Sequence, residues 1–312
     1  MTARVLRRVA WAAAVAWFAI TVTFLILRAV PGDPARLIVG PHAGVEELAR
    51  ARAAHGLDDS LIVQYARYVG HVVQGELGES FRSQRPVREI LAAHAWPTFQ
   101  LLGAAILLQL ALGVPLGLAA ARWSDRWPDR AITGGALLAL SAPPFVVGAL
   151  LFYLAGYRWD LLPISGYGEP GLDRLAHLVL PALAQALPGA AATAQLLRAE
   201  LRGALARDFI RTARAKGVPE RAVLGRHALR PSLPPIVAAV SVDVGVLVTG
   251  AVVVESLFGW PGLGREALLA VLELDMPVVL GVVLLSSVVI AAIMLLADLA
   301  NLALDPRTRR ER

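Results

Sequence analysis

The feature that most constrains this chain is a set of six long apolar runs that are almost free of charge. The runs cover residues 9–27, 98–120, 131–157, 175–197, 232–254 and 277–297, and Asp243 is the only Asp, Glu, Lys or Arg in any of them. Because an α-helix rises about 1.5 Å per residue, each run is long enough to cross a hydrocarbon layer of about 30 Å. Across the chain, 57% of the residues are hydrophobic and only 17% are charged. The sequence therefore predicts an all-α polytopic membrane protein with six transmembrane helices.

The distribution of basic residues predicts the orientation of these helices. Cytoplasmic loops are enriched in Lys and Arg, and an N-terminus inside the cell places nineteen of the thirty on the cytoplasmic side. Eight of the other eleven lie in the long segment 28–97, and long segments cross the membrane largely regardless of their charge. With an even number of spans, we expect both termini to be cytoplasmic. A signal peptide is the alternative for the first run, but the run is long and no small-x-small cleavage site follows it.

Three regions follow from this pattern. Residues 1–27 are expected to form the cytoplasmic N-terminus and the first span, and residues 28–97 an extracytoplasmic helical region with helical periodicity at 45–54 and 61–73. A region of this size is small for an independent core, so we expect it to pack as a cap on the membrane domain, with a dedicated ligand-binding role as the alternative. Residues 98–312 hold the other five spans and form the core domain.

The loop 198–231 is the most basic part of the chain. Between Arg198 and Arg230 it carries nine Lys and Arg, and each Arg at a bilayer centre costs about 2.5 to 3.5 kcal/mol, so the loop must lie in water or among headgroups. Within it, residues 208–217 predict a short helix that ends at Gly217, since glycine suits the left-handed turn after a helix. A small helix displayed between two spans indicates a docking site for a cytosolic partner. The alternative is that these arginines only follow the inside-positive bias.

Few side chains inside the spans are candidates for contact with a solute. Asp243 lies well within the fifth run, where an ionisable residue usually faces a wet cavity or the bundle interior, so it is a candidate for a translocation path. A hydrogen bond to a neighbouring helix is its alternative role. Glu255 lies at the outer end of the same helix, and we expect it to be solvated there and to contact an outer partner or help to form a gate.

Prolines and glycines within the runs are expected to shape the helices. Pro143 and Pro144 are expected to break the third run, and the glycines in 113–117 are expected to allow close helix packing.

The sequence shows no recognisable catalytic or metal-binding motif. The chain has no Cys, and its His residues match no common metal-binding spacing. A phosphate-binding loop ends in Gly-Lys-Ser or Gly-Lys-Thr, whereas Lys216, the only Lys, lies between Ala215 and Gly217. We therefore expect no catalytic residue, metal or cofactor in this chain, and any nucleotide hydrolysis must occur in another subunit.

Short motifs are spread along nearly the whole chain. They are Thr23-Phe24, Arg28, Pro31-Gly32-Asp33-Pro34-Ala35, Gly56-Leu57-Asp58, Gln64-Tyr65, Gly75-Glu76-Leu77-Gly78-Glu79-Ser80, Pro86-Val87, Thr98, Glu255-Ser256-Leu257-Phe258 and Pro261-Gly262-Leu263-Gly264. In order and spacing this set resembles the permease subunits of binding-protein-dependent ABC importers, in particular the dipeptide, oligopeptide and nickel group.

The resemblance implies a fold, partners and a cargo. The fold is the ABC importer type I transmembrane fold in a bacterial inner membrane. The implied partners are a second homologous permease, two cytosolic ATP-binding subunits that hold ATP and Mg²⁺, and an extracytoplasmic solute-binding protein, with no nucleic acid. Di- or oligopeptides are the expected cargo, with nickel or another small solute as the alternative.

The resemblance also implies where the ATPase docks. Such permeases carry a Glu-Ala-Ala, three residues, Gly pattern on a helix that enters a groove of the ATPase, and here Arg211, Thr212, Ala213 and Gly217 occupy the aligned positions. Only the last two keep the strict form. We expect Phe209, Ile210 and Ala213 to be offered to the partner. The full set of expected docking residues is Asp208, Phe209, Ile210, Arg211, Ala213, Arg214 and Gly217.

Two other function classes stay open from the residues alone. An ion-coupled secondary transporter of a small solute ought to carry coupling-ion residues in its spans, where Asp243 is nearly alone. A membrane-embedded hydrolase would need a polar catalytic constellation, and none is visible.

Overall fold

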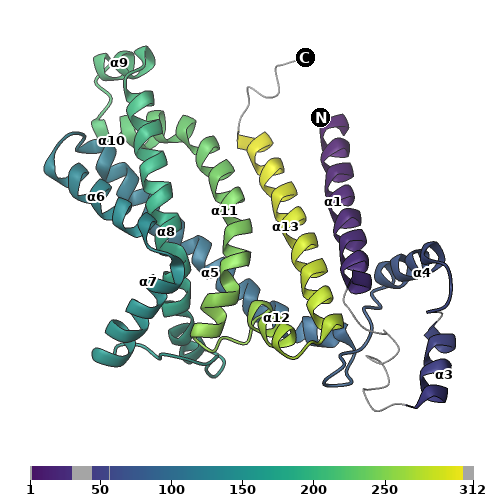
Figure 1. Ribbon diagram of the computed structural model, residues 1–312. Coiled ribbons are helices and arrows are strands. Elements are labelled where there is room, and N and C mark those ends of the chain that lie inside the picture. The colour runs from purple at the N-terminus through teal and green to yellow at the C-terminus, as the bar shows by residue number, and fades with distance from the viewer. Residues whose placement is uncertain (1, 30–43, 56, 305–312) are drawn as a thin grey trace. The chain divides into compact units, whose positions relative to one another are not determined.

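The computed structural model describes residues 2–29, 44–55 and 57–304, and helices dominate this part of the chain (Figure 1). The motif at residues 31–35 lies outside the described residues. The chain divides into two compact units, each of which is described by itself. The first unit comprises Met1–Val5, Pro97–Arg265 and Ala292–Arg312, and the second unit comprises Leu6–Trp96 and Glu266–Ala291.

Five helices in the described part are long and apolar enough to cross a membrane. They contain the described residues of five of the six predicted runs, which confirms the all-α polytopic fold. Most of them extend past their runs, because a helix continues into the headgroup region until a breaker or a turn ends it. The five are α1 (Thr2–Ala29), α5 (Val87–Arg122), α8 (Leu172–Leu205), α11 (Leu229–Leu257) and α13 (Met276–Leu304).

The remaining predicted run is a broken span. It consists of α6 (Trp127–Ser141), α7 (Pro144–Leu151) and the π-helical turn η1 (Phe152–Arg158), with a bend of 104° at the break. Ala142 and Pro143 are extended, with ψ of 125° and 145°, because a proline pushes the residue before it out of the helical region. The expected break at Pro143-Pro144 is confirmed.

The broken span follows α8 from near its C-terminal end to its middle. At its beginning, Asp129 pairs with Arg198, whereas Gly148 of α7 lies against Ala184. These two contacts are fourteen residues apart on α8, or about 20 Å along its axis. Exposed Trp127 and Trp159 mark the two ends, as expected for aromatic side chains at the two membrane interfaces. Counted as one crossing, the bent pair brings the number of spans to six.

Two glycines of α5 let that helix pack closely on α8. A Cβ added at Gly113 would lie 2.8 Å from the Ala190 carbonyl oxygen, and one at Gly117 would lie 2.9 Å from the Ala194 carbonyl oxygen. Helices in lipid associate through such close approaches, since no hydrophobic driving force brings them together there. The expected role of the segment 113–117 is confirmed.

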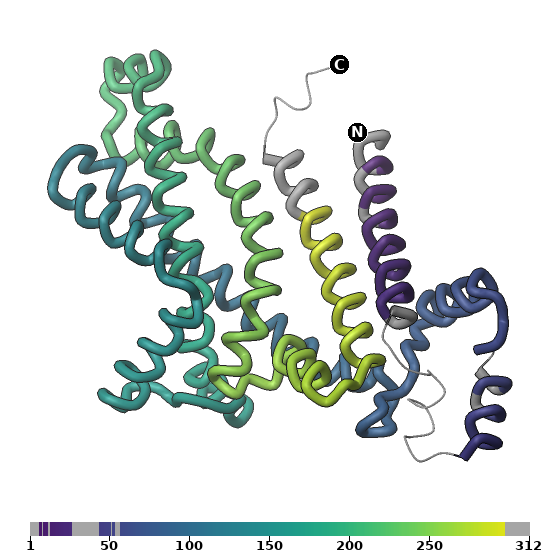
Figure 2. Tube along the Cα trace, viewed as in Figure 1, coloured from purple at the N-terminus to yellow at the C-terminus, as the bar shows by residue number. Residues whose placement is uncertain are grey.

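α11 also packs along α8, and the two helices run side by side in the first unit (Figure 2). α8 is rich in small residues where it is buried, and most of its buried positions are alanines. Small side chains keep the helix axes close and leave little void between them. α8 is therefore the central helix of the first unit, with α5, α6, α7 and α11 around it.

The second unit contains the predicted extracytoplasmic helices. They are present as α3 (Val45–His55) and α4 (Leu61–Val73), as the periodicity predicted. α4 packs on α1, where the Phe24 ring lies 5.3 Å from that of Tyr65 and 5.6 Å from that of Tyr68. Burial raises the pKa of Tyr68 to about 12, so its phenol stays neutral at working pH.

Replacing Gly113 with alanine should destabilise the protein. The added methyl would press on the α8 backbone, and overpacking of this kind costs about 1 to 3 kcal/mol. Thermal unfolding of the purified chain in nanodiscs measures the effect as a lower melting temperature. Gly103→Ala, on the same helix with no atom within 4 Å of the new Cβ, is the matched control and should be neutral or stabilising. Equal melting temperatures for the two variants would contradict the packing described here.

Candidate functional site

The predicted docking helix is present as α9 (Asp208–Ala215), two residues after the end of α8. Its C-terminus is closed by backbone hydrogen bonds, since the Gly217 N–H donates to Arg214 at 2.9 Å and the Val218 N–H donates to Ala213 at 3.2 Å. Gly217 has a φ of +77°, in the left-handed region that favours glycine. Both the helix and its glycine stop are therefore confirmed.

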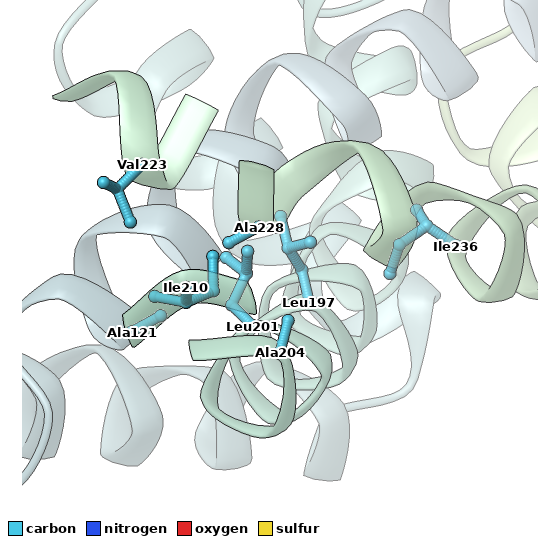
Figure 3. Close-up of a cluster of buried hydrophobic side chains, with 8 residues drawn as sticks. All are labelled: Ala121, Leu197, Leu201, Ala204, Ile210, Val223, Ala228 and Ile236. Atoms are coloured by element: carbon cyan, nitrogen blue, oxygen red, sulfur yellow. The ribbon is translucent and has the colours of Figure 1, made fainter. Parts of the chain in front are cut away.

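One face of α9 packs into the first unit. Ile210 is fully buried and Ala213 is 8% exposed, and Figure 3 shows Ile210 among apolar side chains from several helices. Two short elements, α10 (Glu220–Ala222) and η2 (Val223–Ala228), return the chain from α9 to α11 and help to cover it. We call the buried apolar residues around Ile210 the α9 cluster. Its members are Ala121, Leu197, Leu201, Ala204, Ile210, Val223, Ala228 and Ile236.

The burial of Ile210 and Ala213 corrects a sequence expectation. Both were expected to be offered to a partner, and that was wrong. Residues three apart on a helix share a face, and the chain's own interior covers this one. In this chain Ile210 packs against Leu197, Leu201 and Ala204 of α8, and so it anchors α9 to that helix.

The opposite face of α9 is open. Phe209 is 44% exposed, and the largely exposed side chains of Asp208 and Arg211 pair with each other at 3.4 Å. Arg214 donates two hydrogen bonds to Glu220, at 2.7 and 3.1 Å, and these bonds raise the pKa of its guanidinium. The surface available to a partner is thus one aromatic ring among permanently charged arginines.

Asp243 lies in a polar contact among three helices. Gln109 of α5 is fully buried, and its Nε2 donates to Asp243 Oδ2 of α11 at 2.8 Å and to Thr193 Oγ1 of α8 at 3.2 Å. Gly189 provides the space for this amide, because a Cβ there would lie 2.5 Å from Gln109 Oε1. The hydrogen bond to a neighbouring helix, one of the two expected roles, is therefore present. Asp243 is only partly buried, so its carboxylate is not sealed inside the helix contact.

The environment of Glu255 differs from the sequence expectation. Its side chain was expected to be solvated, but it has no exposed surface. Thr98 Oγ1 donates to Oε1 at 2.7 Å, and the Arg265 backbone N–H donates to Oε2 at 2.9 Å. The segment before α12 (Leu263–Leu272) folds over the carboxylate, and a Cβ at Gly262 or Gly264 would collide with it. Glu255 thus joins the end of α11 and the start of α12 to Thr98 of α5, and direct contact with an outer partner is not open to it in this arrangement.

A second buried carboxylate, Asp275, was missed by sequence reasoning. In the second unit it accepts hydrogen bonds from Ser80 Oγ at 2.5 Å and from the Phe81 N–H at 3.1 Å. Ser80 begins a tight turn, beside an isolated bridge between Glu79 and Pro86. Part of this contact could have been expected, because Ser80 is the last residue of the motif at 75–80 and a buried serine hydroxyl needs a hydrogen-bond partner.

A third buried carboxylate, Asp129, was also missed. It is 2% exposed, and Arg198 donates to both of its oxygens, at 2.5 and 2.7 Å. From the sequence, Arg198 was counted only as the first charge of the basic loop. An acidic residue near the start of one span and a basic residue at the end of another were the signal for such a pair.

The fold and the site define a class of protein. Six spans, a short helix displayed between the fourth and fifth of them, and a helical region after the first belong to the membrane-spanning permease subunit of an ABC importer. The chain belongs to the family described as the inner membrane component of binding-protein-dependent transport systems. The model of this family matches residues 113–310, and the model of the family's N-terminal part matches residues 1–101.

Individual relatives agree with this assignment. The glutathione transport system permease protein GsiC of Salmonella paratyphi A is 39% identical over 286 residues, which are 92% of each chain. GsiC of Escherichia coli K12 is 37% identical over 286 residues, again 92% of each chain. The chain is therefore a multi-pass permease subunit of a bacterial binding-protein-dependent transport system.

Solved structures support the fold at low sequence identity. An inward-facing MetNI methionine ABC transporter matches with a TM-score of 0.56 at 16% identity, covering 69% of this chain and 96% of that one. An amino acid ABC transporter matches with a TM-score of 0.51 at 18% identity, covering 68% and 93%. Identities this low carry the fold alone.

Replacing Glu255 with glutamine should destabilise the protein, although the two side chains have nearly the same shape. A glutamine has one side-chain oxygen for the two donors from Thr98 and Arg265, and it turns an NH₂ group toward one of them. Burying a mismatched polar group costs about 1 to 3 kcal/mol. Thermal unfolding should show a lower melting temperature for Glu255→Gln, and no change for Glu169→Gln, whose position is exposed. A melting temperature equal to that of the wild type would show that the two hydrogen bonds contribute nothing.

Proposed function

We propose that this permease forms a translocation pathway with a second, homologous permease and that cytosolic ATPase subunits drive the pair through α9. The two-sided character of α9 carries the proposal. Ile210 fixes the helix to the chain's own interior, while Phe209 and the arginines beside it are open to a partner. A helix held this way follows a partner that grips its outer face and passes the movement to α8.

Of the docking residues expected from the sequence, five are exposed, and four of these carry side chains that can meet the ATPase. The four are Asp208, Phe209, Arg211 and Arg214, and the fifth is Gly217. The aromatic ring would fill an apolar groove, and the arginines would meet acidic side chains at its rim. Gly217 acts indirectly, because it ends the helix and turns the chain back toward η2.

We further propose that the cargo is a short peptide. The GsiC relatives are named for glutathione transport, and a solute-binding protein outside the cell would deliver the peptide. Asp243 is proposed to lie on the pathway, since it is partly open and sits in the middle of a span. With both termini and α9 in the cytoplasm, the segment 158–171 at the other end of α8 faces the binding protein.

The proposed mechanism is alternating access without covalent chemistry. ATP and Mg²⁺ are bound by the ATPase subunits, and closure of the ATPase dimer moves α9. Packed helices shift as rigid bodies rather than deforming continuously, so movement of α9 would reorient the spans around the peptide. No catalytic residue is required in this chain.

Cysteine labelling tests the position and the partner of α9. The chain has no native Cys, so Phe209→Cys introduces a single thiol. In inside-out vesicles a membrane-impermeant maleimide should label it when the chain is expressed alone. Co-expression with its ATPase subunits should lower the labelling rate at least about tenfold, because a buried thiol is inaccessible.

Leu161→Cys provides the control from the opposite end of the first unit. Leu161 is 67% exposed, and this thiol should react only in right-side-out vesicles, at a rate that does not depend on the ATPase. Labelling of Phe209→Cys from the outside, or an unchanged rate with the ATPase bound, would refute the docking proposal.

A further inference from the structure

A carboxylate and a guanidinium join the start of α6 to the end of α8. Arg198 Nε and Nη2 donate to the two oxygens of Asp129 at 2.5 and 2.7 Å. The Asp125 N–H also donates to Asp129, at 2.9 Å, so the buried carboxylate is well satisfied. Two parallel bonds of this kind fix the orientation of the groups as well as their separation.

A second, more exposed pair lies one turn farther along α8. Arg202 reaches both oxygens of Asp125 at 3.3 Å, with side chains that are 41% and 74% exposed. Arg198 and Arg202 are four residues apart, so they lie on the same face of α8. The start of α6 is thus held at two successive turns of α8. The bonds from Arg198 are the shorter ones, and those from Arg202 are longer and more exposed.

The same turns of α8 also hold α9. Leu197 and Leu201 belong to the α9 cluster, in which Ile210 is buried (Figure 3). Arg198 comes directly after the first of these leucines. A displacement of α9 therefore reaches the part of α8 from which Arg198 extends to α6.

Apolar packing between α6 and α8 adds to this link but does not by itself fix how far α6 lies along α8. Beyond Asp129, the buried residue of α6 is Ala136, while Leu137 and Leu138 are exposed. Apolar contact is non-directional, whereas the two bonds between Arg198 and Asp129 select one register of the two helices. α6 is also separated from α7 by the break at Pro143, which leaves it able to move as a separate rod.

We propose that Asp129 and Arg198 are positioning residues of the transport cycle, which make α6 follow the movement of α9. This inference rests on the proposed function of α9 as the ATPase docking helix. The pair lies outside the docking surface proposed for α9 and away from Asp243, the residue proposed to lie on the pathway. Its loss should leave docking and ATP hydrolysis in place and disconnect them from transport.

The test compares transport with ATP hydrolysis in the assembled importer. Arg198→Lys keeps the positive charge but loses the two-bond geometry, and Asp129→Asn removes the charge of the partner. Complexes of each variant with the second permease and the ATPase subunits are reconstituted in proteoliposomes with the binding protein and a labelled tripeptide. We expect ATPase co-purification within twofold of the wild type, and peptide transported per ATP to fall at least about fivefold in both variants. The double variant Asp129→Arg with Arg198→Asp should restore at least half of the lost coupling.

Arg67→Lys is the matched control, since it makes the same substitution at an exposed pair with Asp59 in the second unit. It should leave transport per ATP unchanged. A ratio within twofold of the wild type in assembled Arg198→Lys and Asp129→Asn complexes would overturn the inference. Loss of the ATPase from the Arg198→Lys complex would also overturn it, because the pair is assigned a place behind the docking surface.

These outcomes are distinct from a failure of the docking proposal. If the ATPase does not protect the thiol of Phe209→Cys, the docking role of α9 fails, and this inference fails with it. If protection is seen and transport per ATP is unchanged in the variants, only the link to α6 is refuted.

Discussion

Hydrocarbon offers no hydrogen-bond partner, and most of this structure follows from that constraint. Backbone groups in lipid must be satisfied within each segment, which leaves helices as the spanning form. Helices in lipid must then be held together by close packing and by polar contacts. In the first unit both devices meet on α8, where Gly113 of α5 lies against the Ala190 backbone and Gln109 donates to Thr193.

The polar contacts of the first unit do more than satisfy the hydrogen-bonding groups that are buried there. Gln109 with Asp243, Thr98 with Glu255, and Arg198 with Asp129 each join different helices. Each has a defined direction, so it fixes how far one helix has slid along its neighbour, which apolar contact does not. Glu255 works near one end of the unit and Asp129 near the other, with Gln109 between them. The unit is therefore held in register at both ends and in the middle.

The positions of the spans could be predicted from the sequence, because long apolar runs have one stable arrangement in lipid. The break at Pro143-Pro144 and the stop of α9 at Gly217 could be predicted for a local reason, the backbone angles of proline and glycine. Burial of Ile210 could not, because it depends on η2 and α8, which only the fold brings to α9. Glu255 was misjudged for the same reason, since the residues that cover it follow a turn whose path is set by tertiary contacts.

The inward anchoring of α9 also divides the evolutionary demands on this short helix between its two faces. Ile210 and Ala213 are buried in the interior of their own subunit, so changes there disturb folding whichever partner is present. In the docking arrangement proposed above, Phe209 and Arg211 face the ATPase, so these side chains can change together with the groove that they meet. The same division would permit Arg211 and Thr212 at positions where the resemblance to importer permeases implies Glu and Ala. It also suggests that importers could exchange motor subunits by altering a few outward side chains, with the membrane part left as it is.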